Sequence, residues 1–187
     1  EAGQALRALL PEEFQSPYYK RHNTLGWNYR MNELTAAVVL AQLERVERLV
    51  QRRQNVAGYF LESLDGCDWI IPQHSPGGYK NSYWTFTVRY LGKEKYNFSW
   101  EDFWKQFKQD GGDGFYGGLS LTVDESVMIE KPFLNHYLPE NLYPEIKDAF
   151  QFEKGSFPVA EDIQPQMMQF KCNYRNLEDA KNQAKIL

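Results

Sequence analysis

Apolar side chains recur every three to four residues between Asn32 and Leu64, with charged residues between them. This spacing is typical of an amphipathic α-helix. Asn32 is suited to cap the start of the helix, and the pair Asp65-Gly66 is suited to end it. The pattern therefore predicts one helix of roughly thirty residues, about 45 Å long. Because a small domain does not need a helix of this length, we expect it to bridge two bodies or two subunits.

The rest of the chain predicts short strands and helices. Residues 82–90 alternate between two faces and are rich in aromatic and β-branched side chains, which indicates a strand. After the capping residue Ser99, four aromatic residues repeat at helical spacing and predict a helix with a buried face. These residues are Trp100, Phe103, Trp104 and Phe107. The other expected elements are helices at 1–10 and 176–187, the second of them capped by Asn176, and strands at 68–72 and 170–174.

The order of these elements predicts the fold class. Two strands and a helix are followed by a long, loop-rich segment at 120–161, and then by another strand and helix. This order is typical of an α+β fold in which helices cover a small, mainly antiparallel sheet.

Composition excludes several classes of protein. The net charge of −4 over 187 residues argues against nucleic acid or an anionic membrane as the main partner. No apolar run approaches the roughly 20 residues that a membrane helix requires, and no signal peptide is visible. Cys67 and Cys172 lack metal-ligand spacing and favour two free thiols over a disulfide. We therefore expect a cytoplasmic protein, and the absence of an initiating Met before Glu1 favours an internal part of a longer one.

The most informative stretch lies just before the long helix. Residues 26–37 read Gly-Trp-Asn-Tyr-Arg-Met-Asn-Glu-Leu-Thr-Ala-Ala, and residues 40–44 read Leu-Ala-Gln-Leu-Glu. This stretch resembles the DegT/DnrJ/EryC1/StrS family of pyridoxal-phosphate-dependent nucleotide-sugar aminotransferases. The resemblance implies the long linking helix and the small C-terminal domain of a fold-type I enzyme. Residues 1–31 would then be a remnant of the large domain with the interface loop, 32–65 the linking helix and 66–187 the small domain.

The resemblance also implies a cofactor site shared between two subunits. It places Asn28 and Arg30 near the phosphate of pyridoxal phosphate in the partner subunit of a homodimer. An amide NH₂ and a guanidinium are both suitable donors to phosphate oxygens. From the residues alone, Asn28 also reads as a turn former, and Arg30 as a partner of Glu33.

The glycine-rich segment 111–118 is a second candidate site. It lacks the Lys-Ser/Thr pair of a phosphate-binding P-loop and does not lead from a strand into a helix. Phe115 and Tyr116 within it are candidates for substrate contact, with simple turn geometry as the alternative. The histidines form no metal-ligand spacing, so we expect no metal site. They are His22, His74 and His136.

The expected mechanism depends on a residue that this chain lacks. The family uses a lysine, upstream of the Asn-Tyr-Arg motif, to form a Schiff base with the cofactor. Neither Lys20 nor Lys154 has a comparable sequence context. We therefore expect no catalytic residue in this chain and no activity from it alone. It would contribute a dimer interface and ligand contacts to an enzyme that aminates a nucleotide-linked keto sugar, with glutamate or a similar amino donor, in polysaccharide or antibiotic sugar biosynthesis.

Two alternatives remain open from the sequence. Some members of the family replace the lysine with histidine and act as pyridoxal-phosphate-dependent sugar dehydratases. In a different class, the chain would be a structural or dimerisation module with no chemistry.

Overall fold

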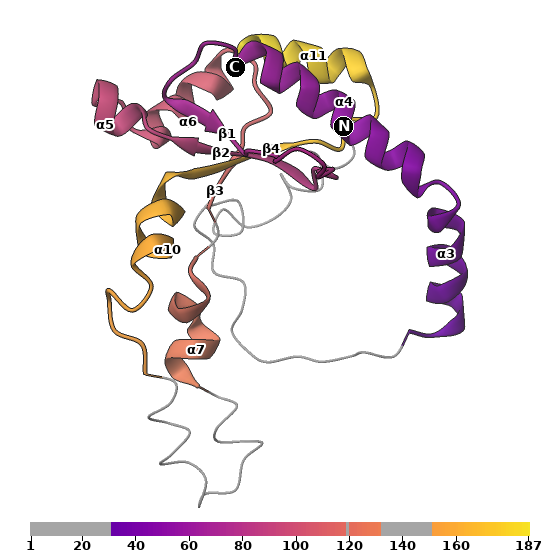
Figure 1. Cartoon of the computed structure of the whole chain (residues 1–187), viewed down its shortest axis with the longest axis horizontal. Helices are drawn as coiled ribbons and strands as arrows, with labels where there is room; N and C mark the ends of the chain where they lie inside the picture. Colours follow the sequence, from indigo (N-terminus) through magenta and orange to yellow (C-terminus); the bar gives the residue numbers. More distant parts are fainter. Residues whose placement is uncertain (1–30, 119, 132–150) are drawn as a thin grey trace, which may run out of the picture. The chain divides into compact units, whose positions relative to one another are not determined.

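The computed structural model describes residues 31–118, 120–131 and 151–187 (Figure 1). The chain divides into two compact units, one formed by Glu1–Asn28 and Leu119–Pro165 and the other by Tyr29–Gly118 and Gln166–Leu187. The helix expected at 1–10 lies outside the described residues.

The second unit contains a four-stranded antiparallel sheet in the order β1-β2-β4-β3. Its strands are β1 (Ile70–Pro72), β2 (Thr85–Tyr90), β3 (Tyr116–Gly117) and β4 (Met167–Lys171). In the register, Ile71 of β1 lies opposite Arg89, and Val88 of β2 lies opposite Met168. The strand expected at 82–90 begins three residues later, and the closing strand lies at 167–171 instead of 170–174. The α+β class with a small antiparallel sheet is confirmed.

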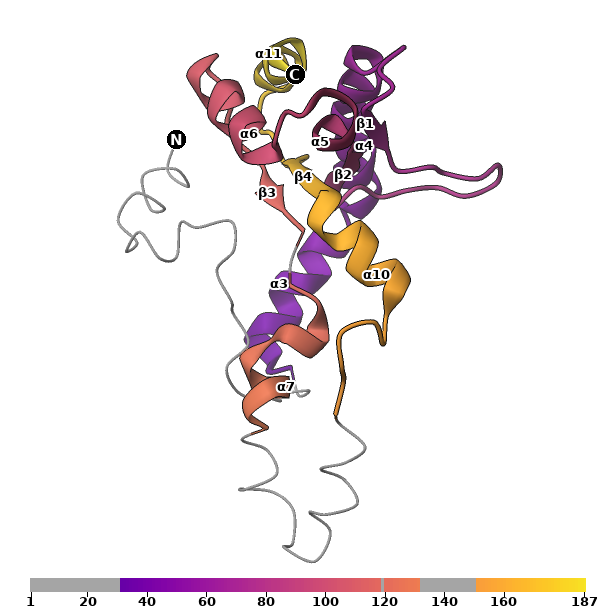
Figure 2. The ribbon, with the colours of Figure 1, turned by 90° about the vertical axis from the view of Figure 1, so that its left-hand side faces the viewer.

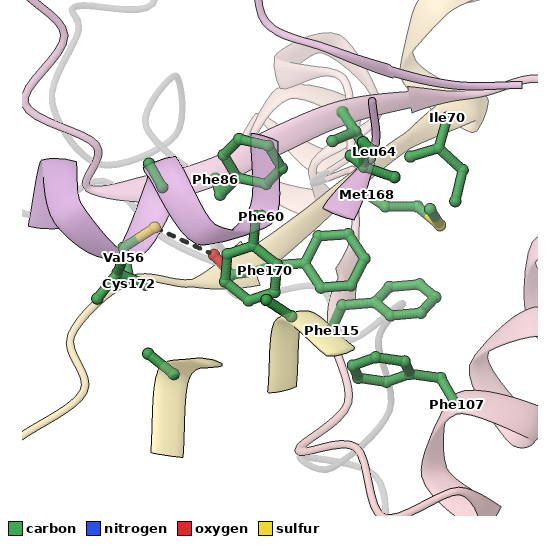
Figure 3. Packing of buried hydrophobic residues seen from close by; sticks show 14 of the residues in the cluster. Val56, Phe60, Leu64, Ile70, Phe86, Phe107, Phe115, Met168, Phe170 and Cys172 are labelled. Atoms are coloured by element: carbon green, nitrogen blue, oxygen red, sulfur yellow. Dashed lines mark hydrogen bonds between the residues drawn. The ribbon is translucent and has the colours of Figure 1, made fainter. Parts of the chain in front are cut away.

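Helices pack on one face of this sheet. The described helices of the second unit are α3 (Glu33–Leu43), α4 (Val46–Ser63), α5 (Gly92–Tyr96), α6 (Trp100–Gln109) and α11 (Leu177–Ile186), of which α3 contributes no buried residue to this packing. Alternate residues of β2 are buried. This alternation is expected for a strand whose sheet is covered by helices on only one face, because successive side chains point to opposite faces. Phe60 of α4 stacks on Phe86 of β2, with ring centroids 5.4 Å apart, and Phe107 of α6 contacts Phe170 of β4 (Figure 3). Ala180 of α11 is buried in the same core.

The prediction of one long helix from Asn32 to Leu64 is wrong, because the structure has two helices there, α3 and α4. The Arg45 N–H bonds to the Gln42 carbonyl, three residues back, so the regular ladder of bonds to the fourth preceding residue is interrupted. The apolar spacing continues through this turn, and for that reason the pattern did not reveal it. The predicted start is confirmed, since the Asn32 side chain accepts from the Thr35 N–H at 2.8 Å.

The two other predicted caps are also confirmed. The Ser99 hydroxyl accepts from the Asp102 N–H at 3.1 Å at the start of α6. The Asn176 side chain accepts from the Glu178 N–H at 3.1 Å at the start of α11. Such bonds satisfy backbone donors that have no partner within the helix.

The described part of the first unit holds three short helical elements: η1 (Thr122–Asp124), α7 (Ser126–Glu130) and α10 (Pro158–Ile163). A further short helical element, η3 (Gln164–Gln166), lies directly before β4. Pro158 occupies the first turn of α10, where its missing N–H has no consequence. The Glu161 carboxylate accepts from the Gly155 and Phe157 N–H groups and ties the loop to the helix. No helix among the described residues is long and apolar enough to cross a membrane.

A glycine at the end of α6 offers a test of this packing. A Cβ atom on Gly112 would lie 2.6 Å from the Phe107 carbonyl oxygen and would also overlap the Phe107 ring. Gly112→Ala is therefore expected to lower the free energy of unfolding by about 1–3 kcal/mol, the usual cost of overpacking. Gly77→Ala is the matched control, because no atom lies within 4 Å of its added Cβ. Urea unfolding of both variants checks this, and equal stabilities would contradict the packing described.

Candidate functional site

The candidate site begins with the loop at 111–115, which side chains from three other elements hold in place. The Asp113 carboxylate pairs with Lys171 of β4 at 2.6 Å. The Asp113 N–H donates to the side chain of Gln183 from α11 at 2.6 Å, and Gln183 donates in turn to the Gly111 carbonyl. The Trp104 indole of α6 donates to the carbonyl of Phe115 at 3.1 Å. The backbone that enters β3 is therefore ordered by specific contacts.

Electrostatics reinforce this arrangement. The Lys171 ammonium lies 4.3 Å from the centroid of the Tyr174 ring, a cation–π geometry. Burial raises the pKa of Tyr174 well above its usual range, and the negative charge of Asp113 raises it further. Tyr174 therefore remains a neutral phenol, while Lys171 carries the charge that balances Asp113.

The two aromatic candidates on this segment, Phe115 and Tyr116, face opposite ways. Phe115 is only 4% exposed, and its ring lies 5.0 Å from that of Phe170 in the core (Figure 3). Tyr116 is the next residue and half-buried, with its hydroxyl oxygen fully buried, and it lies opposite Gln169 on the face of the sheet away from the helices. Packing in the core accounts for Phe115 and leaves it almost no surface for a substrate, whereas Tyr116 remains a candidate for substrate contact.

Tyr116 belongs to a set of residues that we call the polar face. Its members are Thr85, Thr87, Arg89, Tyr116, Gln169 and Lys171, which alternate with the buried positions of their strands. Gln169 lies in the centre, where it accepts from the Thr85 hydroxyl at 3.3 Å and donates to the Gly117 carbonyl at 3.2 Å. The Thr85 and Thr87 hydroxyl oxygens are 3.2 Å apart. Hydroxyl and amide groups both donate and accept, so this face suits a ligand that is rich in hydroxyl groups.

Sequence reasoning did not identify the polar face as a unit. The alternation along 82–90 places Thr85 and Thr87 on one side of a strand. Gln169 comes more than eighty residues later, and no local signal specifies that β4 pairs with β2. Only the register brings the three side chains together.

The predicted cofactor-binding residues Asn28 and Arg30 lie outside the described residues, so their roles stay predictions. The sequence also predicted that this chain lacks the lysine that would bind pyridoxal phosphate, and this too stays a prediction. Such a lysine must lose its proton, and burial is the usual cause. The lysines at 31–118, 120–131 and 151–187 are all exposed or half-buried, and Lys171 is paired with Asp113. None of the lysines in these ranges is buried, so we derive no chemical step through the cofactor.

The histidine and cysteine side chains suggest no further chemistry in the same ranges. No group of three His, Cys, Asp or Glu side chains that could hold a metal ion occurs within the described part of the chain. Both cysteines are free thiols, as predicted. Burial raises the pKa of the Cys172 thiol to about 12, which keeps it protonated and unreactive.

Comparison with known proteins identifies the family. Residues 10–113 match the DegT/DnrJ/EryC1/StrS aminotransferase family, and the chain belongs to it. The match covers the Asn-Tyr-Arg motif and continues through α6.

The relatives that match this chain include proteins named for nucleotide-linked sugars and for lipopolysaccharide biosynthesis. The chain is 33% identical over 67 residues to GDP-perosamine synthase of Vibrio cholerae, which covers 36% of this chain and 18% of that protein. It is 31% identical over 89 residues to UDP-N-acetyl-3-dehydro-alpha-D-glucosamine 3-aminotransferase of Acidithiobacillus ferrooxidans, covering 48% of this chain and 23% of that protein. It is 38% identical over 65 residues to lipopolysaccharide biosynthesis protein RfbH of Salmonella typhimurium, covering 35% of this chain and 14% of that protein. Each aligned stretch thus spans less than a quarter of the relative.

Proposed function

We propose that this chain is part of a pyridoxal-phosphate-dependent aminotransferase that acts on a nucleotide-linked keto sugar, with glutamate or a similar amino donor. The observation that carries the proposal is the family match over residues 10–113, which includes the Asn28–Arg30 motif. The names of two relatives refer to GDP- and UDP-linked sugars, and that of a third to lipopolysaccharide biosynthesis. We propose the same substrate class and a place in polysaccharide sugar biosynthesis in the cytoplasm.

The proposal assigns this chain a supporting part in the reaction. Pyridoxal phosphate, when bound, supplies the electron sink for amino transfer. Asn28 and Arg30 donate to its phosphate region in the partner subunit of a homodimer. Residues 1–31, 32–65 and 66–187 correspond to the interface loop, the linking segment and the small domain of a fold-type I enzyme. The lysine that binds the cofactor lies outside these 187 residues, and the chain alone is inactive.

Tyr116 and the polar face are the proposed contribution to substrate binding. Gln169, Thr85 and Thr87 form a hydrogen-bonded group beside Tyr116, on the face away from the helices. These neutral donors and acceptors match the hydroxyl groups of a sugar ring without the desolvation cost of burying a charge.

A product assay tests the proposed function. The purified protein that carries this chain is incubated with UDP- and GDP-linked keto sugars, pyridoxal phosphate and glutamate, and mass spectrometry follows the sugar. Formation of an amino sugar together with 2-oxoglutarate is expected. Loss of water from the sugar without use of glutamate would instead assign the dehydratase activity. No change in any sugar, by a protein that folds normally, would favour the structural module.

Asn28 provides a test of the cofactor contact. Asn28→Ala in the same protein is expected to weaken pyridoxal phosphate binding by about 1–3 kcal/mol, because a hydrogen bond to a charged group is lost. Asn55→Ala, which removes an exposed amide from α4, is the matched control and should leave the affinity unchanged. Equilibrium titration with the cofactor measures both. If Asn28→Ala left the affinity for pyridoxal phosphate unchanged, Asn28 would have only the alternative role of shaping the turn.

A further inference from the structure

The connection between β1 and β2 ends in a turn that several side-chain hydrogen bonds hold in place. Figure 2 shows the connection extending away from the sheet before it returns to β2. One guanidinium nitrogen of Arg53 donates to the carbonyl oxygens of both Tyr83 and Trp84, at 3.2 and 2.8 Å. Gln54, the next residue of α4, donates to the Asn81 carbonyl at 2.8 Å. Asn81 in turn accepts from the Tyr83 N–H at 2.9 Å.

These contacts hold a backbone conformation that is uncommon for a bulky residue. Tyr83 has φ of 48°, in the left-handed region that glycine adopts most easily. Residues held in such conformations tend to occur at binding and catalytic sites, where the surrounding structure maintains them. Here Arg53 and Gln54 provide that support, because they bind the carbonyl groups on both sides of the strained residue.

The result of the turn is an exposed tryptophan on a fixed backbone. The Tyr83 ring packs toward the core, 6.2 Å from that of Phe86. Trp84, the next residue, is 73% exposed. An aromatic side chain with few rotatable bonds, on an ordered backbone, loses little entropy when it binds a ligand. Lys80, which belongs to the same connection, is exposed, and its ammonium lies 3.9 Å from the Glu47 carboxylate of α4.

We propose that Trp84 stacks on the nucleobase of a nucleoside diphosphate, and that Arg53 is the positioning residue that presents it. The inference rests on the proposed function, since it concerns the nucleotide part of the nucleotide-linked sugar. Base stacking on an aromatic side chain tolerates different bases, because every base has a π-face.

Titration calorimetry with GDP and with UDP tests the proposal on the protein that carries this chain. Trp84→Ala is expected to weaken the binding of both nucleotides about 5- to 150-fold, which is the range for the loss of stacking with one base. Trp84→Phe retains an aromatic ring and should keep most of the affinity. Tyr79→Ala is the matched control, since Tyr79 is an equally exposed aromatic residue of the same connection, and it should bind as the wild type does.

A double-mutant cycle separates positioning by Arg53 from a general structural role. Arg53→Gln should weaken nucleotide binding in the wild-type background. It should have no further effect in Trp84→Ala, because the side chain that Arg53 positions is then absent. An equal loss in both backgrounds would show that Arg53 acts on the fold and would overturn the positioning role.

Three further outcomes are informative. Unchanged nucleotide affinity in Trp84→Ala overturns the stacking role and leaves the proposed function intact. Unchanged affinity together with loss of self-association would place Trp84 in a contact between two copies of the protein, which also overturns it. If the folded wild type binds neither GDP nor UDP, the nucleotide-sugar function itself fails, and this inference fails with it.

Discussion

Phe170→Ala is expected to lower the free energy of unfolding by about 3–5 kcal/mol, the usual cost of removing a buried phenyl ring. Phe170 is 2% exposed and lies at the centre of the core. Its ring contacts those of Phe60, Phe107 and Phe115 at centroid separations of 5.0 to 5.8 Å. These partners come from α4, from α6 and from the loop before β3. The substitution therefore removes contacts that hold three separate segments on β4.

Urea unfolding followed by far-UV circular dichroism measures this effect. Tyr79→Ala is the matched control, because the Tyr79 side chain is 77% exposed, and its loss should cost about 1 kcal/mol or less. Similar midpoints for the two variants would contradict the central position of Phe170.

Leu40→Glu is expected to convert a self-associating protein into a monomer. Helix α3 has no buried residue in this structure, and large apolar side chains point from several of its sides. They are Leu34, Val38, Val39, Leu40 and Leu43. A helix that is hydrophobic all round is normally buried, and leaving each such side chain in water costs about 1.5–3 kcal/mol. A twofold pair in which the same surface meets itself is the simplest closed arrangement that covers them.

Light scattering on a dilution series of the 187-residue chain measures this association. The wild type should be a dimer at micromolar concentration, and Leu40→Glu should shift it toward monomer. Glu62→Ala, on the exposed surface of α4, should leave the size unchanged. A monomeric wild type whose size does not respond to Leu40→Glu would contradict the role of α3 as an interface.

The features that the sequence predicted well depend on neighbouring residues. Caps at Asn32, Ser99 and Asn176 act within one helical turn, so the residue types alone were sufficient to place them. The alternation in 82–90 likewise indicated the strand and its two faces. The Asn-Tyr-Arg motif indicated the family that the comparison then showed.

The features that it missed depend on distant partners. The break between α3 and α4 leaves the apolar spacing intact, so periodicity could not reveal it. β2 begins three residues later than predicted because Arg53 and Asn81 hold Tyr83 in a left-handed conformation. No local feature of the sequence indicates that conformation. The burial of Phe115 follows from its contact with Phe170, which lies 55 residues further along the chain.

The central claim is that this chain supports a pyridoxal phosphate site whose covalent attachment lies elsewhere. Borohydride reduction of the protein that carries it, loaded with pyridoxal phosphate, links the cofactor permanently to its lysine, and peptide mass spectrometry then locates that lysine. The account predicts one stoichiometric label on a lysine outside these 187 residues and none on Lys20, Lys154 or Lys171. A single stoichiometric label on any lysine within the chain would contradict it.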